Sequence, residues 1–152
     1  IIQVDTTDVI YDRPATKFVG EFVGTPTMNF IDVSLVRRNG QTLLDAAEFV
    51  VPLSPELGDL LAEYSEGTEF ILGVRPSDVK IILREKGSGI KMRVSLVQSS
   101  GAIRIATLKT GDISILAEIP RELTLSPDQE VTVEFNMARI HLFDKKTERA
   151  IF

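Results

Sequence analysis

The sequence predicts a mainly β protein: a closed or partly closed antiparallel barrel, preceded by a short helical segment and interrupted by one inserted helix. Two observations lead to this fold class. From residue 30 onward, about nine short apolar runs follow one another, each ended by a turn signal, which is typical of such barrels. Helical spacing of apolar residues occurs in few places. With 152 residues, 43% of them hydrophobic, the chain can bury a full core.

The first 24 residues are predicted to end in a helix. Pro14 suits the first turn of a helix, and Gly24 suits the left-handed conformation that ends one. Pro26 then prevents the helix from resuming. We therefore interpret residues 22–30, FVGTPTMNF, as a joint between a helical segment and a β domain, although a loop inside one domain has the same pattern. The apolar positions of this helix are Phe18, Val19, Phe22 and Val23.

The strands are predicted from alternation and turn residues. FIDVSLV, residues 30–36, places Ile31, Val33 and Leu35 on one face, and Asn39-Gly40 predicts a tight hairpin turn into TLLDAAEFVVPL. The inserted helix is predicted within residues 55–67, where Leu57, Leu60, Leu61 and Tyr64 have helical spacing. The later strands are expected in EFILGV (69–74), VKIIL (79–83), IKMRVSLV (90–97), AIRIATL (102–108), DISILAEI (112–119), VTVEF (131–135) and IHLF (140–143).

Charge and composition disfavour several classes of protein. The net charge is −5 and the isoelectric point about 4.9, with no Trp, whereas proteins that bind nucleic acid present a basic face and aromatic stacking platforms. No Cys occurs, so neither a disulfide nor a thiolate metal site is predicted. No apolar run approaches the roughly 20 residues that span a bilayer.

Catalytic motifs are missing from the sequence. It has no phosphate-binding loop, dinucleotide fingerprint, HExxH or GxSxG pattern. The single histidine, His141, would have to serve any zinc site or assisted nucleophile, and its place between apolar residues of the last predicted strand favours a structural role. We predict that this chain is not an enzyme by itself and has no catalytic, cofactor-binding or metal-binding residues.

Three motifs resemble the ATP-binding subunits of sugar-type ABC importers, the maltose-transporter ATPase family. GVRPSDV at residues 73–79 is similar to that family's G-I-R-P-E pattern, and HLFDKKTERAI at 141–151 to its H-L-F-D-x-x-T-G-x-R-I. Asp5, Gly20 and Glu148 depart from the family residues, and Glu148 replaces a glycine, so a different turn is expected there. The positions that match in the opening block are Gln3, Tyr11, Pro14, Phe18, Val19, Phe22, Gly24, Pro26, Met28, Asn29 and Phe30.

The resemblance implies a division of the chain. Residues 1–24 would be the C-terminal end of an ATPase domain, 25–30 the junction, and 31–152 a regulatory domain of OB-like, TOBE-type β-barrel form. The phosphate loop and the other ATPase motifs would lie upstream of Ile1, so the chain is expected to be part of a longer protein, and ATP and Mg²⁺ would bind only to that parent subunit.

The resemblance also implies a function and partners. The chain would be a regulatory and dimerisation domain of an importer's ATP-binding subunit, with sugars as the expected solutes. Its partners would be a second copy of the subunit, permease subunits reached through the ATPase domain, and in some members a regulatory protein, but no nucleic acid. It would lie in the cytoplasm at the inner face of the membrane. The alternative is a free-standing OB-fold module that binds a small ligand or an oligonucleotide.

Structural roles are predicted for the motif residues. Arg75 precedes a proline and is biased towards extended geometry, and Pro76 can start the turn that follows. Asn29 carries one acceptor and two donor positions, enough to tie backbone groups at the junction. The full set of predicted structural motif residues is Pro26, Met28, Asn29, Phe30, Gly73, Arg75, Pro76, His141 and Phe143.

Overall fold

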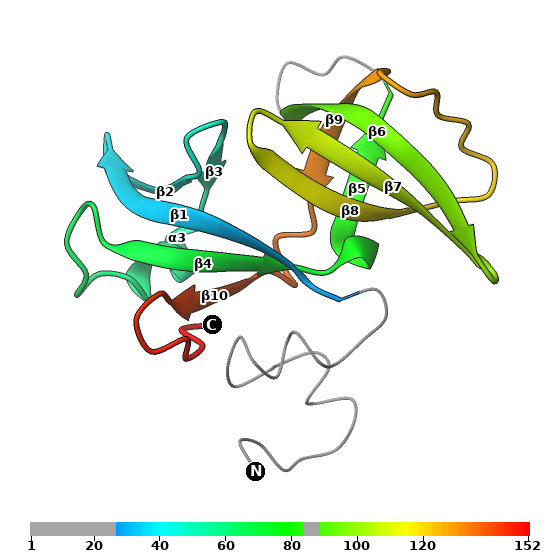
Figure 1. Cartoon of the computed structure of the whole chain (residues 1–152). Helices are drawn as coiled ribbons and strands as arrows, with labels where there is room; N and C mark the ends of the chain where they lie inside the picture. The colour runs from blue at the N-terminus through cyan, green and yellow to red at the C-terminus, as the bar shows by residue number, and fades with distance from the viewer. Residues whose placement is uncertain (1–26, 84–88) are drawn as a thin grey trace, which may run out of the picture. The chain divides into compact units, whose positions relative to one another are not determined.

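The computed structural model describes residues 27–83 and 89–152, which form two five-stranded antiparallel sheets (Figure 1). These residues divide into two compact units. The first unit contains Phe30–Gly73 and His141–Phe152, and the second contains Val74–Ile140 and the residues just before Phe30. Each unit contains one of the two sheets.

The sheet of the first unit has the strand order β10-β4-β1-β2-β3. Alternation on the long strand β1 buries Ile31, Val33 and Leu35, as its sequence predicts. Asn39 and Gly40 both have positive φ, 51° and 77°, which the tight turn between β1 and β2 requires. The strands are β1 (Asn29–Arg38), β2 (Gln41–Asp45), β3 (Val50–Pro52), β4 (Glu69–Val74) and β10 (His141–Asp144).

The inserted helix, α3 (Pro55–Asp59), is present but shorter than the apolar spacing over residues 55–67 suggests. Ser54 caps it by accepting a hydrogen bond from Leu57 N, 3.3 Å away. The chain then continues in tight turns, and the Arg37 guanidinium on β1 donates to the main-chain oxygens of Leu61 (2.8 Å) and Tyr64 (2.7 Å). Since this side chain satisfies carbonyl groups beyond the helix, the segment can pack Leu61 fully into the core without further helical turns.

The sheet of the second unit has the order β5-β9-β6-β7-β8, so β5 and β8 are its edge strands. One face is apolar and buried, with Met92 and Val94 on β6 and Leu108 on β7 among its residues. A bulge interrupts the pairing of β6 with β7 between Val94 and Leu96. The elements are the short 3₁₀ helix η1 (Pro76–Asp78), β5 (Val79–Ile82), β6 (Ile90–Ser100), β7 (Ile103–Thr110), β8 (Ile113–Ile119) and β9 (Glu130–Phe135).

The predicted fold class is confirmed: the described part of the chain is mainly β, antiparallel and OB-like, with one α-helix. The strands belong to two sheets, one in each unit. The predicted N-terminal helical segment and Pro26 lie outside the described residues, and the boundaries at residues 24 and 30 remain predictions. None of the helices within residues 27–83 and 89–152 has the length and hydrophobicity of a membrane-spanning segment.

We predict that Gly89→Ala destabilises the protein much more than Gly101→Ala. Both glycines have positive φ, 129° and 61°, so each substitution adds backbone strain. A Cβ at Gly89 would also lie 2.4 Å from Thr132 Cγ2, whereas a Cβ at Gly101 meets nothing within 4 Å. Urea unfolding should give losses of roughly 2–5 kcal/mol for Gly89→Ala and about 1–2 kcal/mol for Gly101→Ala. Equal losses of stability in the two variants would contradict the close approach of Gly89 to Thr132.

Candidate functional site

The described parts of the three motifs lie near points where the chain passes from one unit to the other. These passages fall between Asn29 and Phe30, between Gly73 and Val74, and between Ile140 and His141. All three are at the ends of neighbouring strands, β1, β4 and β10, of the first sheet (Figure 1). The motif segments around them also hold every buried polar or charged side chain of the described residues: Asn29, Arg75, Asp78 and His141. We treat the motif residues within each unit as the candidate functional residues.

Asn29 ties down the edge of β8 in the second unit. Its Nδ2 donates to the Leu116 main-chain oxygen and its Oδ1 accepts from Leu116 N, both at 2.8 Å. The side chain thus imitates the peptide group of a neighbouring strand, at a point where an edge strand would otherwise leave a donor and an acceptor without a partner. The residue is buried, and its amide holds the Leu116 backbone groups.

The second motif forms a tight turn in which a buried carboxylate pairs with an exposed arginine. Arg75 has extended geometry, φ −73° and ψ 146°, and Pro76 begins the 3₁₀ helix η1, both as predicted. Asp78 closes the turn by donating its N–H to the Arg75 carbonyl oxygen at 2.8 Å. The Asp78 carboxylate is buried and lies 3.3 Å from Nε of Arg139, which follows β9. Asn136 N donates to the Asp78 main-chain oxygen at 2.8 Å, so the turn is bound to the end of β9.

Asp78 was not among the predicted motif residues, although it carries one of the two charges buried in this motif. The signal that could have found it is its position as the last residue of a Pro-Ser-Asp turn, next to an apolar strand. Its partner Arg139 is 61 residues away along the chain, so sequence spacing alone could not pair the two.

The third motif forms β10, which pairs antiparallel with β4. His141 lies opposite Gly73, and Phe143 lies opposite Ile71. Phe143 is fully buried and meets the Phe30 ring edge-on, with centroids 6.1 Å apart. His141 is buried in this last strand, tilted against Phe143 at 6.4 Å. Within residues 27–83 and 89–152, no group of His, Asp and Glu side chains could hold a metal ion.

The turn after β10 is organised by Asp144. Its Oδ1 accepts from the main-chain N–H groups of Lys146 (2.8 Å) and Thr147 (2.9 Å). The hydrogen bond from Thr147 and, to a smaller extent, that from Lys146 lower the pKa of the Asp144 carboxyl below its ordinary value of 3.8. Glu148 adopts φ 59°, the left-handed conformation that glycine favours, and donates its N–H to the Asp144 carbonyl oxygen. Glu148 therefore occupies a turn position of the kind that glycine favours.

One cavity of the second unit borders a motif. It has a volume of about 570 Å³ and lies beside Ser77, between residues of β5 and the end of β8. Its walls are mostly apolar, with charges of both signs from Lys80, Glu118 and Glu122. Its described lining includes Ser77 and Val79 of the second motif but none of the buried polar side chains of the motifs, so those side chains do not build a ligand site there.

Comparison with protein families and curated proteins relates the chain to importers. Residues 24–79 match the family described as "MalK OB fold domain". The trehalose/maltose import ATP-binding protein MalK of Thermococcus litoralis is 36% identical over 156 residues, covering 99% of this chain and 41% of that protein. The sulfoquinovosyl glycerol transport ATP-binding protein SmoE of Agrobacterium fabrum is 33% identical, with coverage of 99% and 41%. The multiple sugar-binding transport ATP-binding protein MsmK of Streptococcus mutans is 30% identical, with coverage of 98% and 40%. The chain thus spans about two fifths of the length of these relatives.

A solved structure supports the fold alone. The cytoplasmic molybdate-binding protein ModG has a TM-score of 0.56 to this chain, covering 75% of it and 94% of ModG, with 14% sequence identity. Because the sequence identity is only 14%, this similarity shows a shared arrangement of strands and nothing about function.

We predict that Asn29→Asp lowers the free energy of unfolding by about 1–3 kcal/mol, because the new carboxylate cannot donate to the Leu116 oxygen and lies beside it. The matched control is Asn39→Asp, in an exposed turn that accepts either residue, with an expected change below about 0.5 kcal/mol. Urea unfolding at neutral pH measures both. Equal effects of the two variants would contradict the role of Asn29.

We also expect Asp144 to stabilise the fold only while it is ionised. Its pKa is lower in the folded than in the unfolded protein, so its contribution is present above pH 3.8 and is lost as the pH falls through the lower folded value. The difference in stability between the wild type and Asp144→Asn should therefore be larger at pH 7 than at pH 3. A difference that does not change with pH would exclude this role.

Proposed function

The chain is related over its whole length to the C-terminal region of the ATP-binding subunits of sugar importers and carries their MalK-type OB fold, and from this premise we propose that it is the regulatory and pairing domain of such a subunit. The observation that carries the proposal is the 36% identity that extends over 99% of this chain. A free-standing binding module would not need to share the segment before the OB fold with importer subunits.

The proposed parent protein is an ATPase of an ABC importer. The relatives are more than twice as long as this chain, and their names describe ATP-binding proteins for maltose, trehalose, sulfoquinovosyl glycerol and other sugars. ATP and Mg²⁺ would bind in the part of the parent that this chain does not cover. The chain would contribute to keeping two subunits together and to receiving regulatory signals while that part opens and closes.

The proposed partners and location follow from this role. They are a second copy of the same subunit, permease subunits contacted through the ATPase domain, and a regulatory protein. The assembly would lie on the cytoplasmic face of the membrane, with sugars as the proposed solutes. The chain's net charge of −5 is unfavourable for nucleic acid as a partner.

The structure supports a role that needs a rigid framework more than a ligand pocket. Two of the buried polar side chains of the motifs are bound within the second unit: Asn29 to the Leu116 backbone and Asp78 to the Arg139 side chain. Such bonds fix the strand ends where the chain passes between the units, which suits a domain that holds subunits together.

We predict that the chain forms a weak dimer and does not bind ATP. Specific interfaces usually bury ~1,200–2,000 Å² in total, and without the ATPase domains only part of that area is available. Sedimentation velocity from ~1 to ~100 µM, a range that reveals weak association, should show a shift from monomer towards dimer. Calorimetric titration of the same sample with Mg-ATP should show only heat of dilution.

The two measurements can fail separately. A strict monomer at the highest concentration would contradict the pairing role but leave the family relationship intact. Binding of ATP at micromolar concentration would contradict the assignment of nucleotide binding to the rest of the parent subunit.

A further inference from the structure

A basic cluster lies on the solvent-exposed face of the second sheet, opposite the buried core face. Lys91 and Arg93 on β6 and Lys109 on β7 are exposed, while their neighbours Met92 and Leu108 point into the core. The strand alternation therefore places all three bases on one face. They stand out in a chain whose net charge is −5. This cluster lies outside the three motifs, and its function does not rest on the importer assignment.

The register places two of these basic residues directly opposite each other on neighbouring strands. Arg93 pairs with Lys109 across β6 and β7, and on its other side with Glu130 across β6 and β9. Directly opposed side chains in an antiparallel sheet are close enough to interact, and like charges in this position are destabilising. Across the sheet, the row therefore runs from Glu130 through Arg93 to Lys109. Lys109 has no acidic neighbour in this row, because it pairs next with Ser114 on β8.

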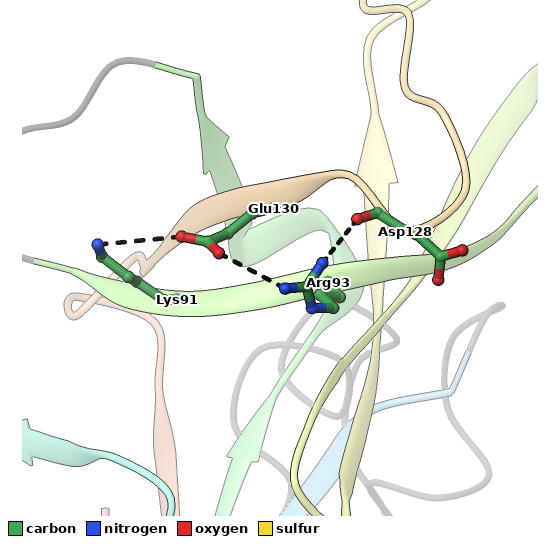
Figure 2. A network of polar contacts seen from close by, with 4 residues as sticks. All are labelled: Lys91, Arg93, Asp128 and Glu130. Atoms are coloured by element: carbon green, nitrogen blue, oxygen red, sulfur yellow. Dashed lines mark hydrogen bonds and ion pairs between the residues drawn. The ribbon is translucent and has the colours of Figure 1, made fainter.

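Glu130 orients two of the bases without making close ion pairs. Figure 2 shows its two carboxylate oxygens facing Lys91 and Arg93 from β9, each 3.9 Å from the nearest nitrogen. Both distances exceed that of a charge-assisted hydrogen bond. Arg93 also donates to the Asp128 main-chain oxygen at 3.0 Å, while the Asp128 carboxylate points away (Figure 2). In the described part of the chain, Lys109 makes no ion pair.

A cavity of about 350 Å³ opens at this cluster. It contains three bases and one acid, a local charge of +2, and Thr110 adds a hydroxyl group at its wall. An anion placed between Arg93 and Lys109 would remove their repulsion and gain charge-assisted hydrogen bonds from both. A tetrahedral anion with two negative charges would neutralise the excess positive charge of the cavity. The residues lining it are Lys91, Met92, Arg93, Lys109, Thr110, Gly111 and Glu130.

We propose that this cavity binds a compact oxyanion of the phosphate type, held between Arg93 and Lys109 with Lys91 at its rim. The charged side chains are well exposed, so solvent and salt screen the attraction. We expect a dissociation constant of the order of 1 mM at low ionic strength. Glu130 opposes the anion and sets this modest affinity, and its replacement by Gln should make binding tighter.

The experiment follows the main-chain amide signals of Arg93, Lys109 and Gly111 by NMR during titration with sodium phosphate at constant ionic strength. Sulfate should cause similar shifts, and perchlorate, a tetrahedral anion with one charge, should bind at least tenfold more weakly. Lys109→Gln should weaken phosphate binding at least tenfold. The control is Lys80→Gln, an exposed lysine on β5 outside the cavity, which should leave the affinity unchanged.

Two further measurements separate a binding role from a structural one. Without added oxyanion at low salt, Lys109→Gln should unfold at the same temperature as the wild type or a higher one, because the repulsion of Arg93 is relieved. Glu130→Gln should bind phosphate more tightly than the wild type. A titration with glycerol phosphate distinguishes the source of the group: equal affinity indicates free oxyanion, and tighter binding indicates a phosphomonoester.

Three outcomes would overturn the proposal. Lys109→Gln and Lys80→Gln could lower phosphate affinity equally, which would indicate general charge attraction. Phosphate up to about 50 mM, well above the expected dissociation constant, could leave the three amide signals unshifted. An acidic peptide could bind through the same residues at least tenfold more tightly than phosphate, which would make an acidic protein surface the ligand.

Discussion

The cost of burying polar side chains constrains this structure most strongly, and Asn29 shows how that cost is met. A buried amide without partners is unfavourable by about 1–3 kcal/mol, and so is a buried main-chain donor. Asn29 and the Leu116 peptide satisfy each other with two hydrogen bonds of 2.8 Å. The same principle governs Asp78, whose buried carboxylate faces Arg139. Both contacts lie within the second unit, near points where the chain enters or leaves it.

Much of the fold follows from local sequence, because local signals decide strands and turns. Asn39-Gly40 predicts the β1–β2 turn, and Arg75-Pro76 predicts the extended residue before η1. The helix is shorter than its apolar spacing suggests, and Arg37, distant in sequence, binds the carbonyls beyond it. The division into two sheets, the bulge on β6 and the pairing of Asp78 with Arg139 depend on long-range register, which local pattern does not encode.

The candidate site was predictable as a set of positions but not as a set of contacts. The resemblance to importer subunits pointed to Asn29, Arg75 and His141, and the structure buries all three. The basic cluster gave no such signal, since Lys91, Arg93 and Lys109 become neighbours only through the pairing of β6 with β7. The motif residues and the proposed anion site are thus different parts of the molecule. The motif residues lie at strand ends, and the anion site lies on an exposed sheet face.

Hydrogen exchange of the Leu116 amide tests most directly whether the motif residues act as internal partners. Leu116 lies on an edge strand, where an outward N–H would exchange quickly with solvent. The account predicts strong protection at Leu116, whose N–H is bound by Asn29, and fast exchange at Glu118, two residues along the same edge. Equally fast exchange at both amides would contradict it, because Asn29 would then not be holding β8.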